Sequence, residues 1–189
     1  MEADPVKASL RKTLLEKRDG ISFELLKISS KKIHKNLKKI KEFKDAENIA
    51  CYYPIGSEVF TQEIIQEALS NNKNVFLPRI EGNSLSFRKI TGTKDLQHGK
   101  FDILEPKEDC PVFESLDVVL VPTIGASKDG ARLGYGHGYY DRFLSKVKTT
   151  SIALTFSKQI IKSVPAYVHD VKVNWIVTED KVINASKIG

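Results

Sequence analysis

The sequence is poor in several features that define other classes of protein. Its 189 residues include two cysteines, one methionine and one tryptophan, and no apolar run approaches the roughly 20 residues that a membrane-spanning helix requires. Cys51 and Cys110 stand too far apart to form a zinc-ligand spacing or a disulfide framework. The first residues hold no apolar segment typical of a signal peptide. These absences argue against zinc-finger, disulfide-stapled and membrane classes, so we expect a cytoplasmic protein with two free thiols and no membrane partner.

The chain does contain enough apolar material for a folded core. Hydrophobic residues make up 41% of the chain and aromatic residues 8%, which is typical of globular domains and not of disordered chains. The length suits one domain better than two. We therefore expect a single domain over residues 1–189, with residues 1–45 as a helical extension packed on it.

The positive charge is unevenly distributed along the chain. There are 30 basic and 24 acidic residues, a formal net charge of +6, and residues 1–50 alone hold 13 basic and 8 acidic residues. A basic N-terminal quarter suits a nucleic acid, a polyanionic small molecule or simply a solvated helix face. Residues 7–44 carry neither an RNA-binding aromatic signature nor a helix-turn-helix pattern. A nucleic-acid-binding module therefore stays as an alternative, which salt-dependent binding to mixed sequences would support.

The hydrophobic pattern predicts helices first and then alternating strands and helices. Apolar residues recur at helical spacing over residues 5–18, and over a longer helix from Ser22 to about residue 43. Further helices are expected over residues 61–69, 138–147 and 158–161. Strands are predicted over residues 48–53, 74–77, 84–90, 117–121, 151–155 and 175–178, and residues 91–115 are expected to be rich in loops.

This alternation predicts the fold class. Strands separated by helices form a mostly parallel sheet with helices on both faces. The expected architecture is therefore α/β, a three-layer α/β/α sandwich with an N-terminal helical extension. Ligands of such folds bind beyond the carboxyl ends of the strands, which directs attention to the segments after residues 53, 121 and 155.

A glycine-rich segment follows the strand predicted over residues 117–121. Residues 132–142 read Arg-Leu-Gly-Tyr-Gly-His-Gly-Tyr-Tyr-Asp-Arg. Glycines let the backbone approach an anion closely, and successive N–H groups can then bind phosphate oxygens. Neither the P-loop motif nor the dinucleotide fingerprint is present. From the spacing alone, a phosphate-binding loop and a flexible turn over a packed tyrosine are equally good interpretations.

A longer string of residues is more specific than the three glycines. From Gly130 to Arg142 the sequence closely resembles the signature of the 5-formyltetrahydrofolate cyclo-ligase family, also called 5,10-methenyltetrahydrofolate synthetases. The family's three-layer α/β sandwich agrees with the predicted architecture. The resemblance covers nearly the whole chain and includes Lys7 with Arg11, the segment from Tyr53 to Thr61, residues 153–159, and Pro165 with His169 and Asp170.

The resemblance implies an ATP-dependent closure of 5-formyltetrahydrofolate to 5,10-methenyltetrahydrofolate, with Mg²⁺ as cofactor and ADP and phosphate as products. The N5-formyl group is amide-like and a poor electrophile, so its oxygen would first be phosphorylated and N10 of the same molecule would then attack. The protein would bind the triphosphate and balance its charge without covalent catalysis of its own. We expect these two small molecules as substrates and a monomer with no nucleic-acid partner.

The resemblance also implies roles for individual residues. The ATP site would comprise Lys7, Arg11, Arg132, Leu133, Gly134, Tyr135, Gly136, His137, Gly138, Tyr139 and Tyr140. The folate site would comprise Arg11, Tyr53, Glu58, Tyr135, Gly136, His137, Gly138 and Tyr139. Asp141 and Asp170 are oxygen donors suited to Mg²⁺. A carboxylate can accept from the neighbouring ring N–H and amino group of a pterin, so Glu58 is assigned to that ring, approaching from a different side than the loop.

Ordinary structural interpretations compete with these roles. Glu58 precedes a helix expected to be capped by Thr61, where an acidic residue favours the helix dipole. Lys7 and Arg11 fit a solvated helix face. Asp141 is a common acid of a helix first turn, and Asp170 fits a turn. A third hypothesis is a sugar-phosphate isomerase or acyl-transferase, which would act without nucleotide.

Two positions depart from the family pattern. Ser127 stands where relatives commonly carry an aspartate, so any role of that carboxylate is absent or displaced onto Asp129. Phe60 is apolar where many relatives carry a polar or acidic residue, which changes the expected shape of the folate pocket. His137 occupies a variable position of the motif and is not assigned as a general base.

Overall fold

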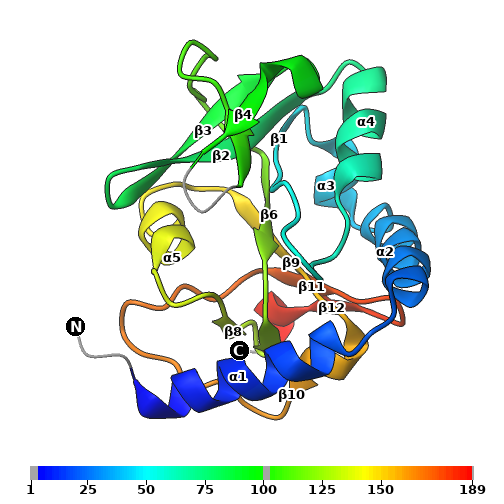
Figure 1. Cartoon of the computed structure of the whole chain (residues 1–189), viewed down its shortest axis with the longest axis vertical. Helices are drawn as coiled ribbons and strands as arrows, with labels where there is room; N and C mark the ends of the chain where they lie inside the picture. The colour runs from blue at the N-terminus through cyan, green and yellow to red at the C-terminus, as the bar shows by residue number, and fades with distance from the viewer. Residues whose placement is uncertain (1–3, 100–102, 189) are drawn as a thin grey trace.

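The computed structural model describes residues 4–99 and 103–188, and its largest sheet has seven strands in the order β12-β11-β9-β6-β1-β2-β3 (Figure 1). Strands β2, β1, β6, β9 and β11 run parallel, and β3 and β12 pair antiparallel at the two edges. The strands are β1 Asn48–Ala50, β2 Asn74–Glu81, β3 Ser84–Ile90, β6 Val118–Pro122, β9 Thr150–Leu154, β11 Trp175–Val177 and β12 Val182–Asn184. This is the mostly parallel sheet that the sequence predicts.

Helices cover both faces of this sheet and one of its ends. Helices α2, α3 and α4 lie on one side and α5 on the other, while α1 crosses the molecule near the carboxyl end of β6 (Figure 1). The α-helices are α1 Pro5–Asp19, α2 Phe23–Leu37, α3 Lys41–Asp45, α4 Gln62–Ser70 and α5 Tyr139–Leu144. The three-layer α/β architecture is thus confirmed. Within the described part of the chain, no helix is long and apolar enough to cross a membrane.

The helix predicted from Ser22 to residue 43 is in fact two helices. Ser22 does begin α2, since its hydroxyl accepts from the Leu25 N–H at 3.4 Å, but α2 ends at Leu37 and Ile40 is extended. No glycine or proline marks the break, and Leu37, Ile40 and Phe43 keep helical spacing and are all buried. Periodicity therefore cannot reveal this boundary.

Other boundaries also differ from the sequence-based expectation. The strand predicted over residues 48–53 ends at Ala50, and the helix predicted over residues 138–147 covers Tyr139–Leu144. The helix expected near residue 158 is a 3₁₀ turn, Ser157–Gln159, followed by the short strand β10, Ile160–Ile161. Thr61 is the N-cap residue of α4 as expected, but its side chain makes no capping hydrogen bond, since its hydroxyl donates to the Tyr52 carbonyl at 2.6 Å.

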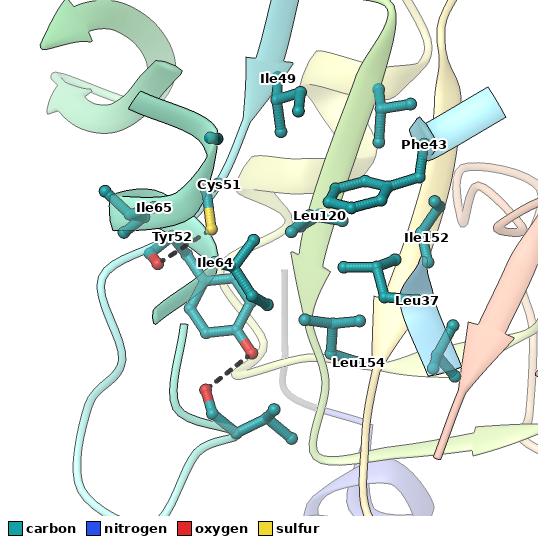
Figure 2. Packing of buried hydrophobic residues seen from close by; sticks show 14 of the residues in the cluster. Leu37, Phe43, Ile49, Cys51, Tyr52, Ile64, Ile65, Leu120, Ile152 and Leu154 are labelled. Atoms are coloured by element: carbon teal, nitrogen blue, oxygen red, sulfur yellow. Dashed lines mark hydrogen bonds between the residues drawn. The ribbon is translucent and has the colours of Figure 1, made fainter. Parts of the chain in front are cut away.

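Two apolar clusters fill the space on either side of the sheet. Leu37 of α2 and Ile64 of α4 pack against Leu120 and Ile152 of the sheet (Figure 2). The preceding strand residue, Val119, belongs to the cluster on the opposite face. Successive side chains of a strand point to opposite faces, so the continuous apolar run of β6 reflects burial on both sides.

A third apolar cluster docks α1 onto a small second sheet. This sheet has the order β10-β7-β8, where β7 is Gly125–Ser127 and β8 is Arg132–Leu133. Leu14 of α1 is 2% exposed and packs with Ile124 and Leu133. A Cβ atom at Gly125 would lie 2.5 Å from a Leu14 methyl carbon, so the absence of a side chain there lets the helix come this close.

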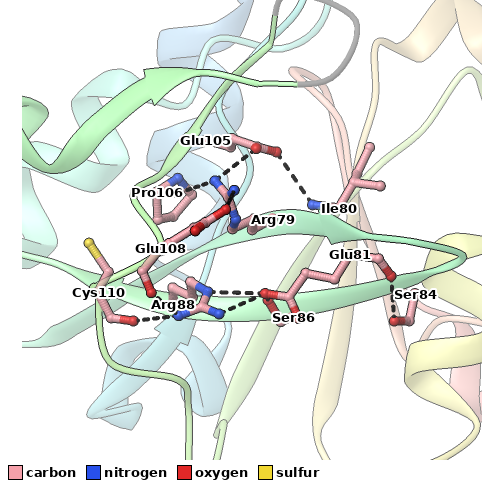
Figure 3. Close-up of polar contacts among 10 residues, drawn as sticks. All are labelled: Arg79, Ile80, Glu81, Ser84, Ser86, Arg88, Glu105, Pro106, Glu108 and Cys110. Atoms are coloured by element: carbon pink, nitrogen blue, oxygen red, sulfur yellow. Dashed lines mark hydrogen bonds and ion pairs between the residues drawn. The ribbon is translucent and has the colours of Figure 1, made fainter.

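The segment expected to be loop-rich contains a small hairpin held by ion pairs. Strands β4 (Leu96–His98) and β5 (Leu104–Pro106) pair antiparallel. Arg79 of β2 donates to the buried Glu105 at 2.9 Å and to Glu108 at 2.8 Å, and Arg88 of β3 donates to the carbonyls of Glu108 and Cys110 at 2.7 and 2.9 Å (Figure 3). These contacts fasten the segment to the outer strands of the main sheet, away from the site described next.

Candidate active site

Arginine side chains from three segments hold the glycine-rich loop, residues 134–138. Arg11 Nε of α1 donates to the Gly134 carbonyl at 2.8 Å, and Arg142 Nη1 of α5 donates to the His137 carbonyl at 2.9 Å. Arg132, at the start of the loop, places Nη1 against Gly134. The loop therefore lies among three fixed positive charges, which is an environment that favours a polyanion.

Gly136 is required by both the backbone and its surroundings. Its φ angle is +99°, which side-chain-bearing residues rarely adopt. A Cβ atom there would lie 3.2 Å from Arg11 Cζ. The bare backbone at this position thus lets the Arg11 guanidinium lie directly on the loop.

Arg132 is a buried cation with one unused donor. Its side chain is 4% exposed and its Nη2 pairs with Asp141 Oδ1 at 3.0 Å. Burial lowers the pKa of Arg132, whereas the neighbouring Asp141 raises it. Its Nε has no hydrogen-bond partner among the described residues. Buried donors are normally satisfied, so this unpartnered atom marks a place where the structure leaves a hydrogen bond unmade.

Glu58 is a buried carboxylate that faces the glycine-rich loop. It is 3% exposed, Oε2 accepts from the Ile55 N–H at 2.8 Å, and Oε1 accepts from the Tyr135 hydroxyl at 2.8 Å. Burial raises the pKa of Glu58, although these hydrogen bonds and Arg18 act in the opposite direction. Its carboxylate is held by these groups, so a role as a helix-dipole acid does not describe its contacts.

The contact between Tyr135 and Glu58 changes one expectation. The sequence led us to expect that Glu58 and the loop approach the substrates from different sides. Instead, the loop reaches Glu58 directly through the Tyr135 hydroxyl. Burial and the nearby Glu58 carboxylate raise the pKa of Tyr135 to about 12, so the tyrosine stays a neutral donor. The loop and Glu58 form one continuous site.

Arg18 belongs to this site and was missed by the sequence analysis. It is 3% exposed, Nη2 donates to the Tyr135 hydroxyl at 2.9 Å, and Nε donates to Ser57 Oγ at 2.9 Å. Its Nη1 is buried with no partner among the described residues. A sequence signal did exist, because Lys7, Arg11 and Arg18 are spaced by four and seven residues and share a face of α1.

Lys7 is not a solvated lysine. It is 7% exposed, and its Nζ lies 2.5 Å from Asp170 Oδ2 and 4.5 Å from the centre of the Tyr167 ring. Burial opposes ionisation of Asp170, but hydrogen bonds from Lys7 and from the Tyr167 N–H outweigh it and lower the Asp170 pKa. The first turn of α1 is thereby tied to the segment around residue 170.

The two predicted metal ligands lie on adjoining segments. Asp141 Oδ1 accepts from the Val171 N–H at 3.0 Å, which places it beside the residue that follows Asp170. Each carboxylate already has a cationic partner, Arg132 for Asp141 and Lys7 for Asp170. The described residues contain no cluster of three or more metal-binding side chains. Two carboxylates nevertheless suit Mg²⁺, which typically binds one or two of them together with phosphate oxygens and water.

The remaining predicted site residues differ in what they offer. Tyr53 is partly buried against the larger apolar cluster. The Tyr139 ring lies 5.2 Å from Arg142 Cζ and 5.7 Å from the His137 ring. The hydroxyl of Tyr140 is buried without a partner among the described residues. Leu133 is 1% exposed in the cluster under α1, so its side chain serves packing.

The two departures from the family pattern are both accommodated. Ser127 is buried, and its hydroxyl donates to Asp129 Oδ1 at 2.6 Å. Lys172 pairs with the same carboxylate at 2.7 Å, and these contacts lower the pKa of Asp129 to about 2. Asp129 is therefore engaged with Lys172. Phe60 contacts Phe23 at a ring distance of 5.7 Å and lines a cavity of about 300 Å³ between α2 and α4.

Several lysines of the basic N-terminal quarter form ion pairs. Away from the glycine-rich loop, ion pairs join Lys31 to Glu63 at 3.5 Å, Lys38 to Glu67 at 2.6 Å and Lys41 to Asp45 at 2.6 Å. Glu63 and Glu67 of α4 lie outside residues 1–50 and thus offset part of the surplus, whereas Asp45 is already counted within it. These pairs lie at the solvent-exposed surface, so they do not test the nucleic-acid alternative, which relies on an accessible basic face.

Comparison with known proteins gives matches over nearly the whole chain. A family model described as the 5-formyltetrahydrofolate cyclo-ligase family matches residues 3–179. The chain is similar to the solved 5,10-methenyltetrahydrofolate synthetase of Aquifex aeolicus, with 35% identity, 95% of this chain and 93% of that chain covered, and a TM-score of 0.86. The synthetase of Mycoplasma pneumoniae is 26% identical, with 92% and 98% covered and a TM-score of 0.74.

A curated relative from yeast extends the match. The 5-formyltetrahydrofolate cyclo-ligase of Saccharomyces cerevisiae is 27% identical over 205 residues, covering 94% of this chain and 97% of the relative. The mouse enzyme of the same name is 29% identical over 158 residues, covering 74% and 76%. The family model alone spans most of the chain, and the fold and the loop signature agree with it. The chain belongs to the 5-formyltetrahydrofolate cyclo-ligase family.

Proposed function

We propose that this protein catalyses the ATP-dependent cyclisation of 5-formyltetrahydrofolate to 5,10-methenyltetrahydrofolate. One structural observation carries the proposal: the hydroxyl of Tyr135, in the loop among three arginines, binds the buried carboxylate of Glu58 at 2.8 Å. This contact supports the proposal, because it joins the loop that would bind phosphate to the carboxylate that would accept from the pterin ring. Transfer of a phosphoryl group from ATP to a folate requires this adjacency.

The nucleotide would bind along the glycine-rich loop. The charges of Arg11, Arg132 and Arg142 surround the loop, and the unused Arg132 Nε supplies a further donor. Fixed positive groups of this kind stabilise the charge that develops on a transferring phosphoryl group. Lys7, one turn before Arg11, completes the basic face of α1.

The folate would bind with its pterin ring at Glu58. A carboxylate that is 3% exposed and already oriented by the Ile55 N–H accepts from the ring's N–H and amino groups. The Tyr135 hydroxyl occupies one of these acceptor positions, so the loop tip moves when the ring binds. Tyr53 and Tyr139 supply aromatic surface for the rest of the substrate.

The chemistry follows from this placement. The formyl oxygen attacks the γ-phosphorus of ATP and ADP departs, which leaves an iminium-like carbon. N10 attacks that carbon to close the ring, its proton is lost, and the C–O bond breaks as phosphate leaves. Both nucleophile and electrophile belong to the same molecule, so the protein contributes orientation and electrostatic stabilisation.

Mg²⁺ fits the same proposal. Asp141 and Asp170 are the residues that would hold it, because their carboxylates lie on adjoining segments beside the loop. The ion would supply charge neutralisation for the triphosphate. Arg132 and Lys7, the present partners of the two carboxylates, would then be released toward the nucleotide.

The proposal has a direct test. Protein, ATP, Mg²⁺ and 5-formyltetrahydrofolate are mixed, and the methenyl-folate chromophore is followed by absorbance. We expect the chromophore only when all components are present. Chromophore formation at the same rate without ATP would refute the ATP-dependent mechanism, and its absence from the complete mixture would refute the function.

The wider setting belongs to the same proposal. We expect one domain acting as a monomer in the cytoplasm, on small-molecule substrates and without nucleic-acid or membrane partners. The contacts of α1 with β7, the loop and residue 170 support treating residues 1–45 as part of that domain.

A further inference from the structure

Arg18 is a buried charged residue of the site to which the proposed function assigns no role. It is 3% exposed, lies near the end of α1 and is fixed from one side by the Ser57 hydroxyl at 2.9 Å. Ser57 in turn donates to Asp19, so the guanidinium is held by a short chain of hydrogen bonds. Burying a charged group costs free energy unless its donors are used. Nη1 nevertheless has no partner among the described residues.

The Tyr135 hydroxyl bridges Arg18 and Glu58. It accepts from Arg18 Nη2 at 2.9 Å and donates to Glu58 Oε1 at 2.8 Å. The Arg18 guanidinium and the Glu58 carboxylate are thus neighbours, and the Tyr135 hydroxyl forms a hydrogen bond with each of them. When Tyr135 leaves, the site presents a guanidinium donor beside a carboxylate acceptor.

This pattern matches one edge of the pterin ring. Along that edge the ring has an amino group at C2, an N–H at N3 and a carbonyl at C4, which are two donors followed by one acceptor. Glu58 can take both donors, and a donor beside it is needed for the carbonyl. We propose that Arg18 donates to the C4 carbonyl of the folate, so that Arg18 and Glu58 together select a 4-oxo pterin; this inference rests on the proposed function.

The charges around Arg18 and Glu58 are consistent with binding of a 4-oxo pterin. The groups that face Glu58 are Arg18 from α1, Tyr135 from the loop, the Ile55 N–H, and the buried Tyr52 and Tyr140. Arg18 is the cation among those that act on Glu58. Its charge therefore opposes the effect of burial on the Glu58 pKa, and so favours the ionised carboxylate that acceptance from two ring donors requires.

The experiment compares two ligands on three proteins. The ligands are 5-formyltetrahydrofolate and the same compound with an amino group in place of the C4 carbonyl. The proteins are wild type, Arg18→Gln and Ser57→Ala, each titrated at equilibrium with both ligands and with ATP. Ser57→Ala is the matched control, because it removes the Nε contact of Arg18 while leaving its two terminal nitrogens in place.

We expect Arg18→Gln to weaken 5-formyltetrahydrofolate binding by about tenfold to a hundredfold, as for the loss of a charge-assisted hydrogen bond. Binding of the 4-amino compound should change much less, because its amino group faces a like donor in the wild type. Ser57→Ala should leave the ratio of the two affinities unchanged. Arg18→Lys, which retains charge and a donor, should recover part of the preference for the 4-oxo ring.

Other outcomes would overturn the inference. Equal loss of affinity for both rings would show a purely structural role for Arg18, and a larger loss for ATP than for folate would assign Arg18 to the nucleotide. If Arg18→Gln does not fold, the same titrations are made on Arg18→Lys. Should Arg18→Lys bind 5-formyltetrahydrofolate as tightly as the wild type and keep the full preference for the 4-oxo ring, selection by the guanidinium would also be refuted. Failure of the wild type to form the methenyl chromophore would instead refute the proposed function, which separates the two results.

Discussion

Replacing Glu58 with glutamine tests the pterin site most sharply. The substitution keeps the size of the side chain but exchanges a carboxylate for an amide. In the structure, Oε2 is held by the Ile55 N–H and Oε1 by the Tyr135 hydroxyl, so Oε1 is the atom that a ring donor would take over. An amide NH₂ at that position would face another donor.

The magnitude follows from this single contact. Loss of a hydrogen bond to a charged group costs about 1.5–3 kcal/mol, which corresponds to roughly tenfold to a hundredfold in affinity. We expect 5-formyltetrahydrofolate binding to weaken by that factor. ATP binding should stay within about twofold, because the loop arginines are untouched. Equilibrium titration of each ligand on wild type and Glu58→Gln measures both.

The same substitution makes a prediction about stability. Burial raises the pKa of Glu58 above its ordinary value of 4.5, so the ionised carboxylate is unfavourable in the folded protein without substrate. Between 4.5 and the raised pKa the folded state binds more protons than the unfolded state, so wild-type stability falls as pH rises through this window. Glu58→Gln lacks this dependence and should melt at an equal or higher temperature than wild type at pH 7.

Two results would refute this reasoning. Equal weakening of ATP and folate would show that Glu58 supports the loop and does not bind the pterin. A clearly lower melting temperature at pH 7, with the same pH profile as wild type, would show that the buried carboxylate stabilises the fold. Titration of the Arg18 variants with the 4-oxo and 4-amino ligands tests the same pocket independently.

Three further substitutions test the remaining parts of the site. Gly136→Val should weaken ATP at least about tenfold in nucleotide titrations, with less effect on folate, because a branched side chain opposes the φ angle of +99°; unchanged ATP affinity would reject the loop assignment. Lys7→Ala should raise the Michaelis constant for ATP more than that for folate, and equal changes would make α1 merely structural. Asp141→Asn should raise the Mg²⁺ concentration needed for half-maximal rate. It should also lower the melting temperature, because the buried Arg132 loses its ion pair. Wild-type turnover of this variant at ordinary Mg²⁺ would remove Asp141 from the metal site.

Much of the fold was predictable because it depends on local periodicity. The apolar run of residues 118–121 and the alternation of strands with helices predict a parallel sheet buried on both faces, and β6 with its two clusters confirms this. The break between α2 and α3 was not predictable. Leu37, Ile40 and Phe43 continue the helical spacing across it, and no glycine or proline marks it, so the local sequence gives no sign of the break.

Part of the candidate site could likewise be predicted from the sequence, and part could not. The sequence by itself determined the loop signature, the fold class and the family, because glycine spacing and a fixed order of residue types are properties of the chain alone. It also supplied Glu58 and the acidic pair Asp141 and Asp170 as candidates. These remain predictions as ligand contacts.

Only the tertiary structure decided which of these groups meet. Tyr135 reaches Glu58 across 77 positions of sequence, and Arg18 reaches Tyr135 across 117. Such contacts depend on how α1 and the loop pack at the carboxyl end of the sheet, and no local pattern encodes a distance between segments so far apart. Burial, which turns Lys7 and Arg18 from ordinary helix charges into oriented donors, is likewise a property of the assembled molecule.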